Sequence, residues 1–142
     1  MNESLEMARR VLAAQSFSVL LDARVTVFGA GAAEVRIPIT SNLKQQNGFV
    51  HGGVVSYAAD NVLTFAGGSI LGRAVVTSEY KINYVRPAGG DELVARASVV
   101  HAGKNQAVCR CEVYSVSAGQ ETLCAVAQGT ITLLSQSANS AA

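Results

Sequence analysis

Charged residues are scarce in this sequence: lysine and arginine total 11 and aspartate and glutamate 10 among 142 residues, a net charge of +1. Their share, 15%, compares with about 25% in an average soluble domain. No run of basic residues is present, so a nucleic-acid partner is not expected. Apolar residues make up 49%, which excludes an intrinsically disordered chain. So little charge indicates that much surface is buried, in part between subunits.

Long apolar runs are also missing. The longest stretch without charge, from Thr122 to Ala142, is interrupted by polar residues and glycine. A membrane-spanning helix needs about 20 mostly apolar residues, so no membrane span is expected. The first 14 residues have no apolar segment and carry four charges, at Glu3, Glu6, Arg9 and Arg10. They are unlike a signal peptide, and we predict a cytoplasmic protein.

Cysteine is rare, and its count is odd: Cys109, Cys111 and Cys124. An odd count in a cytoplasmic protein predicts reduced thiols rather than disulfides. The Cys-x-Cys pair places both side chains on one strand face. Neither histidine, His51 or His101, stands at a zinc-site spacing from them. We therefore expect no metal and no other cofactor.

The pattern of the chain predicts a single domain over residues 1–142, with a core at about 25–133, a short helix at 3–14 and a flexible tail at 135–142. Apolar residues cover most of one long helix, from Gly53 to about Ile70, which predicts that it is buried. Strands are expected at 25–28, 33–39, 75–86, 92–101, 107–116 and 123–133. Short turns join the last four, which predicts an antiparallel meander. The predicted architecture is α+β, with one sheet wrapped around the helix.

The loop that enters the long helix reads NGFVHGG, from Asn47 to Gly53. At a helix start the backbone N–H groups have no intrahelical partner, and the helix dipole adds positive potential. Gly52 and Gly53 allow close approach to these donors, which is typical of an anion or oxyanion site. The alternative is a tight turn that needs glycines only for packing.

Asp60 stands in the middle of this helix among alanine and aliphatic residues. A carboxylate there is costly unless it is paired or functional. It shares one helical stripe with residues of little aliphatic bulk, namely Gly53, Tyr57, Thr64 and Gly67, and this stripe could line a pocket. The alternative is an Asp60 that only makes local hydrogen bonds. Seven residues of helix span about 10 Å, so Gly53 and Asp60 can act on one carbonyl only from two different subunits.

Other candidates carry weaker signals. His51 could be a base, but a role in capping the helix start is the preferred interpretation. His101 and Thr77 are compatible with ordinary strand positions. Arg86, Lys104 and Arg110 could meet phosphates, although each alone is typical of solvated surface. The Gly-x-Ser-x-Gly motif and a Ser-His-Asp spacing are absent.

The segments NGFVHGGVVSYAADNVLTFAGG and VVTSEYKINYVRPA resemble the hotdog-fold acyl-CoA thioesterases, most closely their phenylacetate-pathway (PaaI-like) branch. The family pattern is a glycine, two residues, His-Gly-Gly and an acidic residue nine positions after the histidine, followed later by an aromatic residue three positions before proline. These positions are Gly48, His51, Gly52, Gly53, Asp60, Tyr84 and Pro87. The resemblance covers about Val25 to Leu133.

The resemblance implies a curved antiparallel sheet around one central helix, and dimers or dimers of dimers with active sites at the interface. It implies that the Gly52 N–H polarises the thioester carbonyl and that Asp60 of the opposing subunit is the general base or nucleophile. Thr77 would orient the water or Asp60. Gln45 takes the place of a family asparagine, and Asn47 follows two positions later. Bound substrate would also meet Gly53, Tyr57 and Thr64, with Arg86 and Lys104 near the phosphates of CoA.

The function expected from these residues is hydrolysis of an aryl- or medium-chain acyl-CoA thioester by a homo-oligomer, a dimer or a homotetramer. Two other functions were considered. One is a non-catalytic acyl-CoA or small-ligand binder on the same scaffold, since fold alone does not give function. The other is a hotdog dehydratase, which is disfavoured because His51 precedes the helix.

Overall fold

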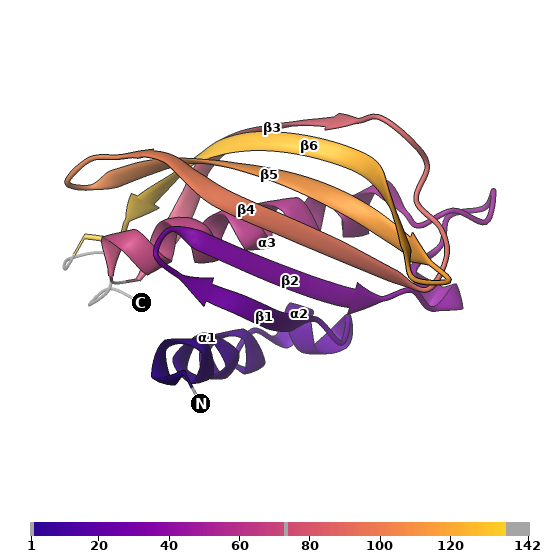
Figure 1. Cartoon of the computed structure of the whole chain (residues 1–142), viewed down its shortest axis with the longest axis horizontal. Helices are drawn as coiled ribbons and strands as arrows, with labels where there is room; N and C mark the ends of the chain where they lie inside the picture. Colours follow the sequence, from indigo (N-terminus) through magenta and orange to yellow (C-terminus); the bar gives the residue numbers. More distant parts are fainter. Residues whose placement is uncertain (1, 73, 136–142) are drawn as a thin grey trace.

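The computed structural model describes residues 2–72 and 74–135. Six antiparallel strands form one sheet in the order β1-β2-β4-β5-β6-β3, and this sheet curves around α3 (Figure 1). Along the chain the elements are α1 (Glu3–Ala13), α2 (Ser16–Leu20), β1 (Arg24–Gly29), β2 (Ala32–Pro38), the 3-10 turn η1 (Ser41–Leu43), α3 (Gly52–Leu71), β3 (Val75–Tyr84), β4 (Glu92–Ala102), β5 (Gln106–Ser117) and β6 (Gln120–Leu133). The predicted hotdog architecture is confirmed.

The core lies between α3 and the concave face of the sheet. The helix predicted at 53–70 is observed one residue longer at each end. Its buried residues are Val55, Ala58, Ala59, Val62, Leu63, Phe65, Ala66 and Gly67. They pack on inward-facing strand residues such as Ile37, Leu93 and Ile131, each with no exposed surface. Gly72 ends the helix in a left-handed conformation with φ of 80°, which favours glycine.

The predicted meander of the last four strands is wrong in one respect. β4, β5 and β6 form a meander, but β3 pairs with β6 at the far edge, through partners such as Tyr80 and Gly129. β4 pairs with β2 instead, with Val35 opposite Ala95. Residues 85–91 are therefore a crossing between distant strands, and not a hairpin turn. Their N–H groups bond outside any hairpin, for example Val85 to the Cys124 carbonyl at 2.8 Å.

The N-terminal helices lie along β1, at the opposite edge of the sheet from β3 (Figure 1). Asn2 begins α1, and its side chain accepts the Ser4 N–H at 2.9 Å. The short α2 was not predicted. The flexible tail was predicted at 135–142, and all of this range except residue 135 lies outside the described residues. In the described part of the chain, no helix combines the length and apolar character needed to cross a membrane.

Candidate active site

The start of α3 presents a backbone donor at a glycine. His51 is the N-cap, and its Nδ1 accepts the Gly53 N–H at 2.9 Å. Among the described residues, the Gly52 N–H has no hydrogen-bond partner. The histidine side chain therefore occupies one donor of the His-Gly-Gly turn and leaves the other available to a ligand. This geometry agrees with the preferred interpretation of His51 as a capping residue.

A surface hollow of about 490 Å³ lies beside this helix start. It brings together six of the residues singled out in the sequence: Gln45, Asn47, Gly52, Tyr84, Arg86 and Pro87. The Gln45 side-chain oxygen accepts the Asn47 backbone N–H and so shapes the loop. Arg86 Nη1 donates to the Leu123 carbonyl at 3.1 Å, at the exposed rim. The remaining lining residues, which sequence reasoning had not assigned, are Phe49, Val50, Val55, Val85 and Ala88.

A row of polar contacts joins α3 to β3. The Tyr84 hydroxyl donates to the Gly52 carbonyl at 3.1 Å. The Ser56 and Tyr80 hydroxyls are hydrogen-bonded one helical turn further. Another turn on, Thr77 Oγ1 donates to Asp60 Oδ1 at 2.5 Å. We call this row the α3–β3 seam: Gly52, Ser56 and Asp60 on the helix, with Tyr84, Tyr80 and Thr77 on the strand.

Asp60 is held by hydroxyl groups alone. Besides the Thr77 bond, Thr64 Oγ1 donates to the Asp60 backbone carbonyl at 2.8 Å and lies 3.0 Å from Thr77 Oγ1. No salt bridge reaches Asp60 within residues 2–72 and 74–135. Its Oδ2 has no partner among these residues either, and it keeps some exposed surface in the protomer. One carboxylate oxygen is fixed, and the other is accessible to a water or substrate.

The donor and the carboxylate are far apart within one protomer. Eight residues of α-helix separate Gly52 from Asp60, a distance of about 12 Å along the axis. Both residues are only partly buried in the isolated chain. One reacting carbonyl therefore cannot meet both groups of the same protomer.

Tyr57 points away from the seam, toward α2. Its hydroxyl accepts the Asn61 amide at 2.8 Å and is hydrogen-bonded to Ser18. The Phe17 ring packs edge-on against it, with ring centroids 5.2 Å apart. Sequence reasoning missed Phe17 and Ser18, because α2 is too short to give a helical pattern. It also missed Asn61, whose partners are Tyr57 on α3 and Gln15 at the start of α2.

One expectation about the site needs correction, and another residue lies apart from the rest. Gly67 does not line a pocket: a Cβ at this position would lie 2.8 Å from Ile131, so the glycine allows helix and sheet to pack closely. Lys104 lies in the turn between β4 and β5, at the end of the molecule opposite the start of α3 (Figure 1). It is not near Arg86 in the same protomer.

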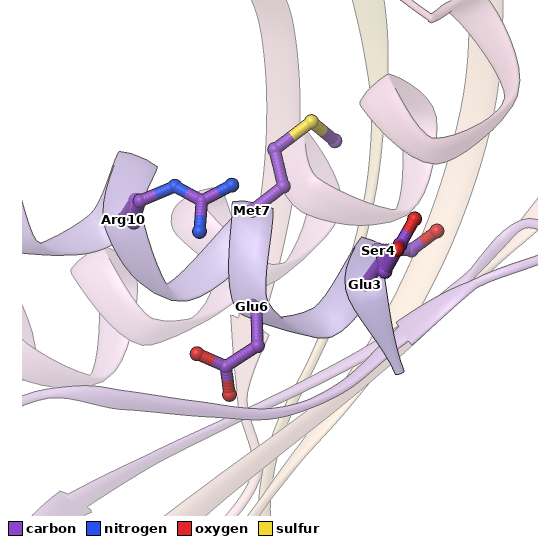
Figure 2. Close-up of a pocket in the computed structure, with 5 residues that line it drawn as sticks. All are labelled: Glu3, Ser4, Glu6, Met7 and Arg10. Atoms are coloured by element: carbon purple, nitrogen blue, oxygen red, sulfur yellow. The ribbon is translucent and has the colours of Figure 1, made fainter. Parts of the chain in front are cut away.

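Another surface hollow, of about 600 Å³, lies elsewhere, on the outer side of α1. Figure 2 shows that its lining residues all come from this one helix: Glu3, Ser4, Glu6, Met7 and Arg10. It contains no residue of the seam or of the His-Gly-Gly turn. Where the structure is described, no three His, Cys, Asp or Glu side chains gather closely enough to hold a metal ion.

The chain matches the model of the thioesterase superfamily over residues 47–122, a range that contains Gly52, Asp60 and Thr77. It is 32% identical to a thioesterase family protein from Silicibacter pomeroyi, covering 89% of this chain and 95% of that one, with a TM-score of 0.84. A thioesterase from Haemophilus influenzae is 25% identical over 94% and 92% of the two chains, with a TM-score of 0.81. A mutant of the phenylacetic acid degradation protein PaaI from Thermus thermophilus is 28% identical over 84% and 100%, with a TM-score of 0.73. The PaaI-like resemblance is confirmed.

Proposed function

Because this chain belongs to the thioesterase superfamily and is a thioester hydrolase, we propose that it hydrolyses an aryl- or medium-chain acyl-CoA thioester to the free acid and CoA. The observation that carries the proposal is the state of Asp60. One of its carboxylate oxygens is fixed by Thr77 at 2.5 Å, while the other is open and no cation neutralises the charge among the described residues. Such a carboxylate is suited to act as a base or a nucleophile.

In the proposed mechanism, Asp60 Oδ2 removes a proton from water as the water attacks the thioester carbonyl, and later gives this proton to the departing CoA thiolate. In the alternative, Asp60 Oδ2 attacks that carbon itself, and water then hydrolyses the resulting mixed anhydride to the free acid. The Gly52 N–H donates to the carbonyl oxygen as negative charge develops there. Collapse of the tetrahedral intermediate breaks the carbon–sulfur bond and releases the CoA thiolate. Thr77 positions the carboxylate through Oδ1, so that Oδ2 faces the reacting atoms.

The two groups would come from different subunits of a homodimer. The separation of about 12 Å along α3 supports this arrangement, since Gly52 and Asp60 of one protomer cannot both contact the same substrate carbonyl. The exposed edge strand β3 supports it as well, because its outer edge is unpaired in the protomer and a second copy could extend the sheet there. A homotetramer built from two such dimers is compatible with the low charge of the chain.

The hollow at the start of α3 is the proposed place for the pantetheine end of CoA. Arg86 at its rim would meet a phosphate, and the amides of Gln45 and Asn47 would donate to polar atoms of the substrate. Lys104 lies far from this hollow, so a role for it on CoA would have to come from another protomer. On α3, Gly53 and Tyr57 come between the two groups in sequence, and Thr64 lies one turn beyond Asp60.

The first test is turnover of a panel of aryl- and acyl-CoA thioesters, followed by release of free thiol. We expect Asp60→Asn to remain folded and to lose about 10²- to 10⁴-fold in kcat, the usual contribution of a general base. Near-normal turnover by the folded variant would remove Asp60 from the mechanism. A folded wild-type protein that binds CoA esters without hydrolysing them would instead support the ligand-binding function.

A second test asks whether the site spans two subunits. Gly52→Pro removes the N–H, at a first helical position where proline is well tolerated. The preceding His51 has φ of −58° and ψ of 134°, which is compatible with a following proline. Gly52→Ala is the matched control, because it keeps the N–H and its Cβ would make ordinary contacts with Tyr84 at 3.6 Å.

We expect inactive Asp60→Asn and inactive Gly52→Pro proteins to regain activity when they are unfolded together and refolded as a mixture. In a mixed dimer, one site combines an intact Asp60 with an intact Gly52 from the other chain. If both groups acted within one protomer, every chain in the mixture would remain inactive. Each variant refolded alone is the control.

A further inference from the structure

Two opposite charges on the edge strand β3 have no counter-charge within the protomer. Glu79 and Lys81 are both exposed and lie two residues apart. A Glu79 carboxylate oxygen accepts the Thr130 hydroxyl at 2.7 Å, and Lys81 Nζ donates to the Asn83 side chain at 2.9 Å. Among the described residues, neither takes part in an ion pair. Both charges are therefore available to a partner at this edge of the sheet (Figure 1).

A β-bulge at Ser78 decides which residues of β3 face α3. The pairing with β6 skips from Thr77 to Glu79, so Thr77 and Tyr80 both contact the helix although they are three residues apart. From Glu79 onward the side chains alternate regularly, with Tyr80 on the inner face and Glu79 and Lys81 on the outer face. The two charges thus stand on either side of Tyr80.

Only certain registers allow a second copy of β3 to pair with this edge. Two identical antiparallel strands are related by a twofold axis, and residues directly opposite each other point to the same face of the sheet. Some residue therefore lies opposite itself, and the candidates at the middle of β3 are Glu79, Tyr80 and Lys81. Glu79 or Lys81 at the axis would bring two like charges together, which is unfavourable. With Tyr80 at the axis, Glu79 of each copy lies opposite Lys81 of the other.

The composite active site requires the same register. Ser56 stands midway along α3 between Gly52 and Asp60, four residues from each. If Gly52 of one copy and Asp60 of the other act on one carbonyl, and the converse holds at the second site, the twofold axis passes beside Ser56. The Ser56 hydroxyl is hydrogen-bonded to that of Tyr80. The charges on the strand and the spacing on the helix thus place the axis at the same contact.

We propose that two copies of β3 pair antiparallel with Tyr80 opposite itself, and that ion pairs between Glu79 of one copy and the partner's Lys81 set this register. The inference rests on the proposed function, since it fixes how the two halves of the composite site meet. Two such pairs form in each dimer, on the outer face of the extended sheet. Their main effect is specificity, because exposed pairs contribute little free energy while a slipped register brings like charges together.

Cysteine cross-linking reads the register directly. Residues directly opposite each other in an antiparallel pair have Cα atoms about 4.5–5.5 Å apart, within the range of a disulfide. A mixture of Glu79→Cys and Lys81→Cys proteins, refolded together and mildly oxidised, should therefore give a covalent dimer. Each variant alone should not, because its two new cysteines would be about 8 Å apart. The wild type is the control, since Cys109, Cys111 and Cys124 are buried.

Charge exchange tests the ion pairs themselves. Glu79→Lys and Lys81→Glu each give a homodimer with two repulsive pairs, whereas the mixed dimer has two attractive ones. Exposed pairs change an equilibrium constant about two- to fivefold each, so mixed dimers should make up about four-fifths or more of a refolded mixture, against about half for random association. Ion-exchange chromatography separates the three dimers by net charge. The excess should shrink in about 1 M salt, which screens exposed charges.

The matched control is a second pair of opposite charges with the same spacing. Arg110 and Glu112 also lie on the outer face of the sheet, but on β5, which is already paired with β4 and β6 on its two sides. A refolded mixture of Arg110→Glu and Glu112→Lys proteins should therefore contain about half mixed dimers, the random proportion.

Every outcome bears on the inference. Cross-linking of Glu79→Cys alone or of Lys81→Cys alone would show a slipped register, and a random proportion of mixed dimers from the charge variants would show that the ion pairs do not form; either result overturns the inference. Absence of any cross-link would also remove the two-subunit site. The proposed hydrolysis is decided separately, by turnover of the wild type, so its failure is distinguishable from a failure of this interface.

Discussion

Two polar clusters occupy opposite faces of the sheet, and each is built around a carboxylate that accepts a threonine hydroxyl. On the outer face, Thr26 donates to Glu34 at 2.7 Å, and on the inner face Thr77 donates to Asp60 at 2.5 Å. The other contacts of the outer cluster are ion pairs between carboxylates and arginines; its members are Glu34, Arg36, Glu92, Arg96 and Glu121. The α3–β3 seam adds only hydroxyl groups and carbonyls.

The presence or absence of an arginine partner distinguishes the structural carboxylate, Glu34, from the reactive one, Asp60. Glu34 pairs with Arg36 at 2.9 Å and with Arg96 at 2.6 Å, so both of its oxygens are occupied. Burial raises its pKa, but the hydrogen bonds from Thr26, Arg96 and Arg36 outweigh burial and hold the pKa below its ordinary value. Asp60 keeps an open oxygen and, in the described part of the chain, no such cation. A carboxylate whose lone pairs are all engaged cannot accept a proton in a reaction, whereas one with an open oxygen can.

The largest expected difference between the clusters is in turnover. Asp60→Asn and Glu34→Gln each remove one negative charge at almost constant shape. We expect the first to lower kcat by about 10²- to 10⁴-fold and to change the free energy of unfolding by less than about 0.5 kcal/mol, since it breaks no ion pair. Steady-state kinetics and urea unfolding of the two variants measure both quantities. If Glu34→Gln lost as much turnover as Asp60→Asn, the division into a structural and a reactive cluster would be wrong.

The next effect concerns the threonine hydroxyl that donates to each carboxylate, Thr26 to Glu34 and Thr77 to Asp60. Thr77→Val removes the donor to Asp60 Oδ1 at constant shape, which frees the carboxylate to rotate. We expect kcat to fall about 10- to 100-fold with little change in KM, the cost of a misplaced catalytic group. Thr77→Ser keeps the hydroxyl and is the matched control, expected within about threefold of the wild type. A loss in Thr77→Ser but not in Thr77→Val would mean that the methyl contact of Thr77 matters, and not its hydrogen bond.

The sequence was sufficient for the parts of the fold that depend on local pattern. Apolar residues around most of the helix at 53–70 predict a buried central helix, and alternation along 92–101 and 107–116 predicts strands. The partner of β3 was not predictable in this way, because alternation gives the face that each residue takes and not the neighbouring strand. The helix α2 has five residues, fewer than two turns, so no periodic signal exists for it.

The candidate site likewise contains residues that the sequence predicts and contacts that depend on how the elements pack. Asp60 is conspicuous in sequence because a carboxylate among alanine and aliphatic residues needs a reason, and the gap to Gly53 can be counted along a helix. The resemblance implied that Thr77 orients the water or Asp60, but the geometry of this contact, and the aromatic contact of Phe17, depend on how β3 and α2 pack on α3. The prediction for Gly67 was wrong because a small residue on a helix face is compatible both with a pocket and with close packing. The position of Ile131 shows that Gly67 allows close packing.

A smaller effect is expected for stability at the outer cluster. Glu34→Gln leaves Arg36 and Arg96 without their shared carboxylate, and because both arginines are about one-third exposed we expect a loss of only about 1–2 kcal/mol in unfolding free energy. Since the folded pKa of Glu34 lies below 4.5, its contribution is complete above that pH and is lost as pH falls through the lower folded value. Urea unfolding of both proteins at pH 7 and pH 3.5 should show the difference shrink in acid. Glu121→Gln is the control, expected to cost less because its side chain is 35% exposed.

The smallest effect has the opposite pH dependence and arises between the two clusters, at the buried thiols of β5. Burial raises the pKa of Cys109 to about 11 and that of Cys111 to about 12, from an ordinary value of 9.0. An unfolded chain therefore releases protons near pH 9 that the folded chain retains, and stability falls as pH rises toward these values. At pH 9 the loss is about 0.4 kcal/mol for each thiol. Urea unfolding at pH 7 and pH 9 should show this loss in the wild type and not in a Cys109→Ala/Cys111→Ala protein, whose lysines and tyrosines are the same; equal slopes in the two proteins would exclude the thiols as its source.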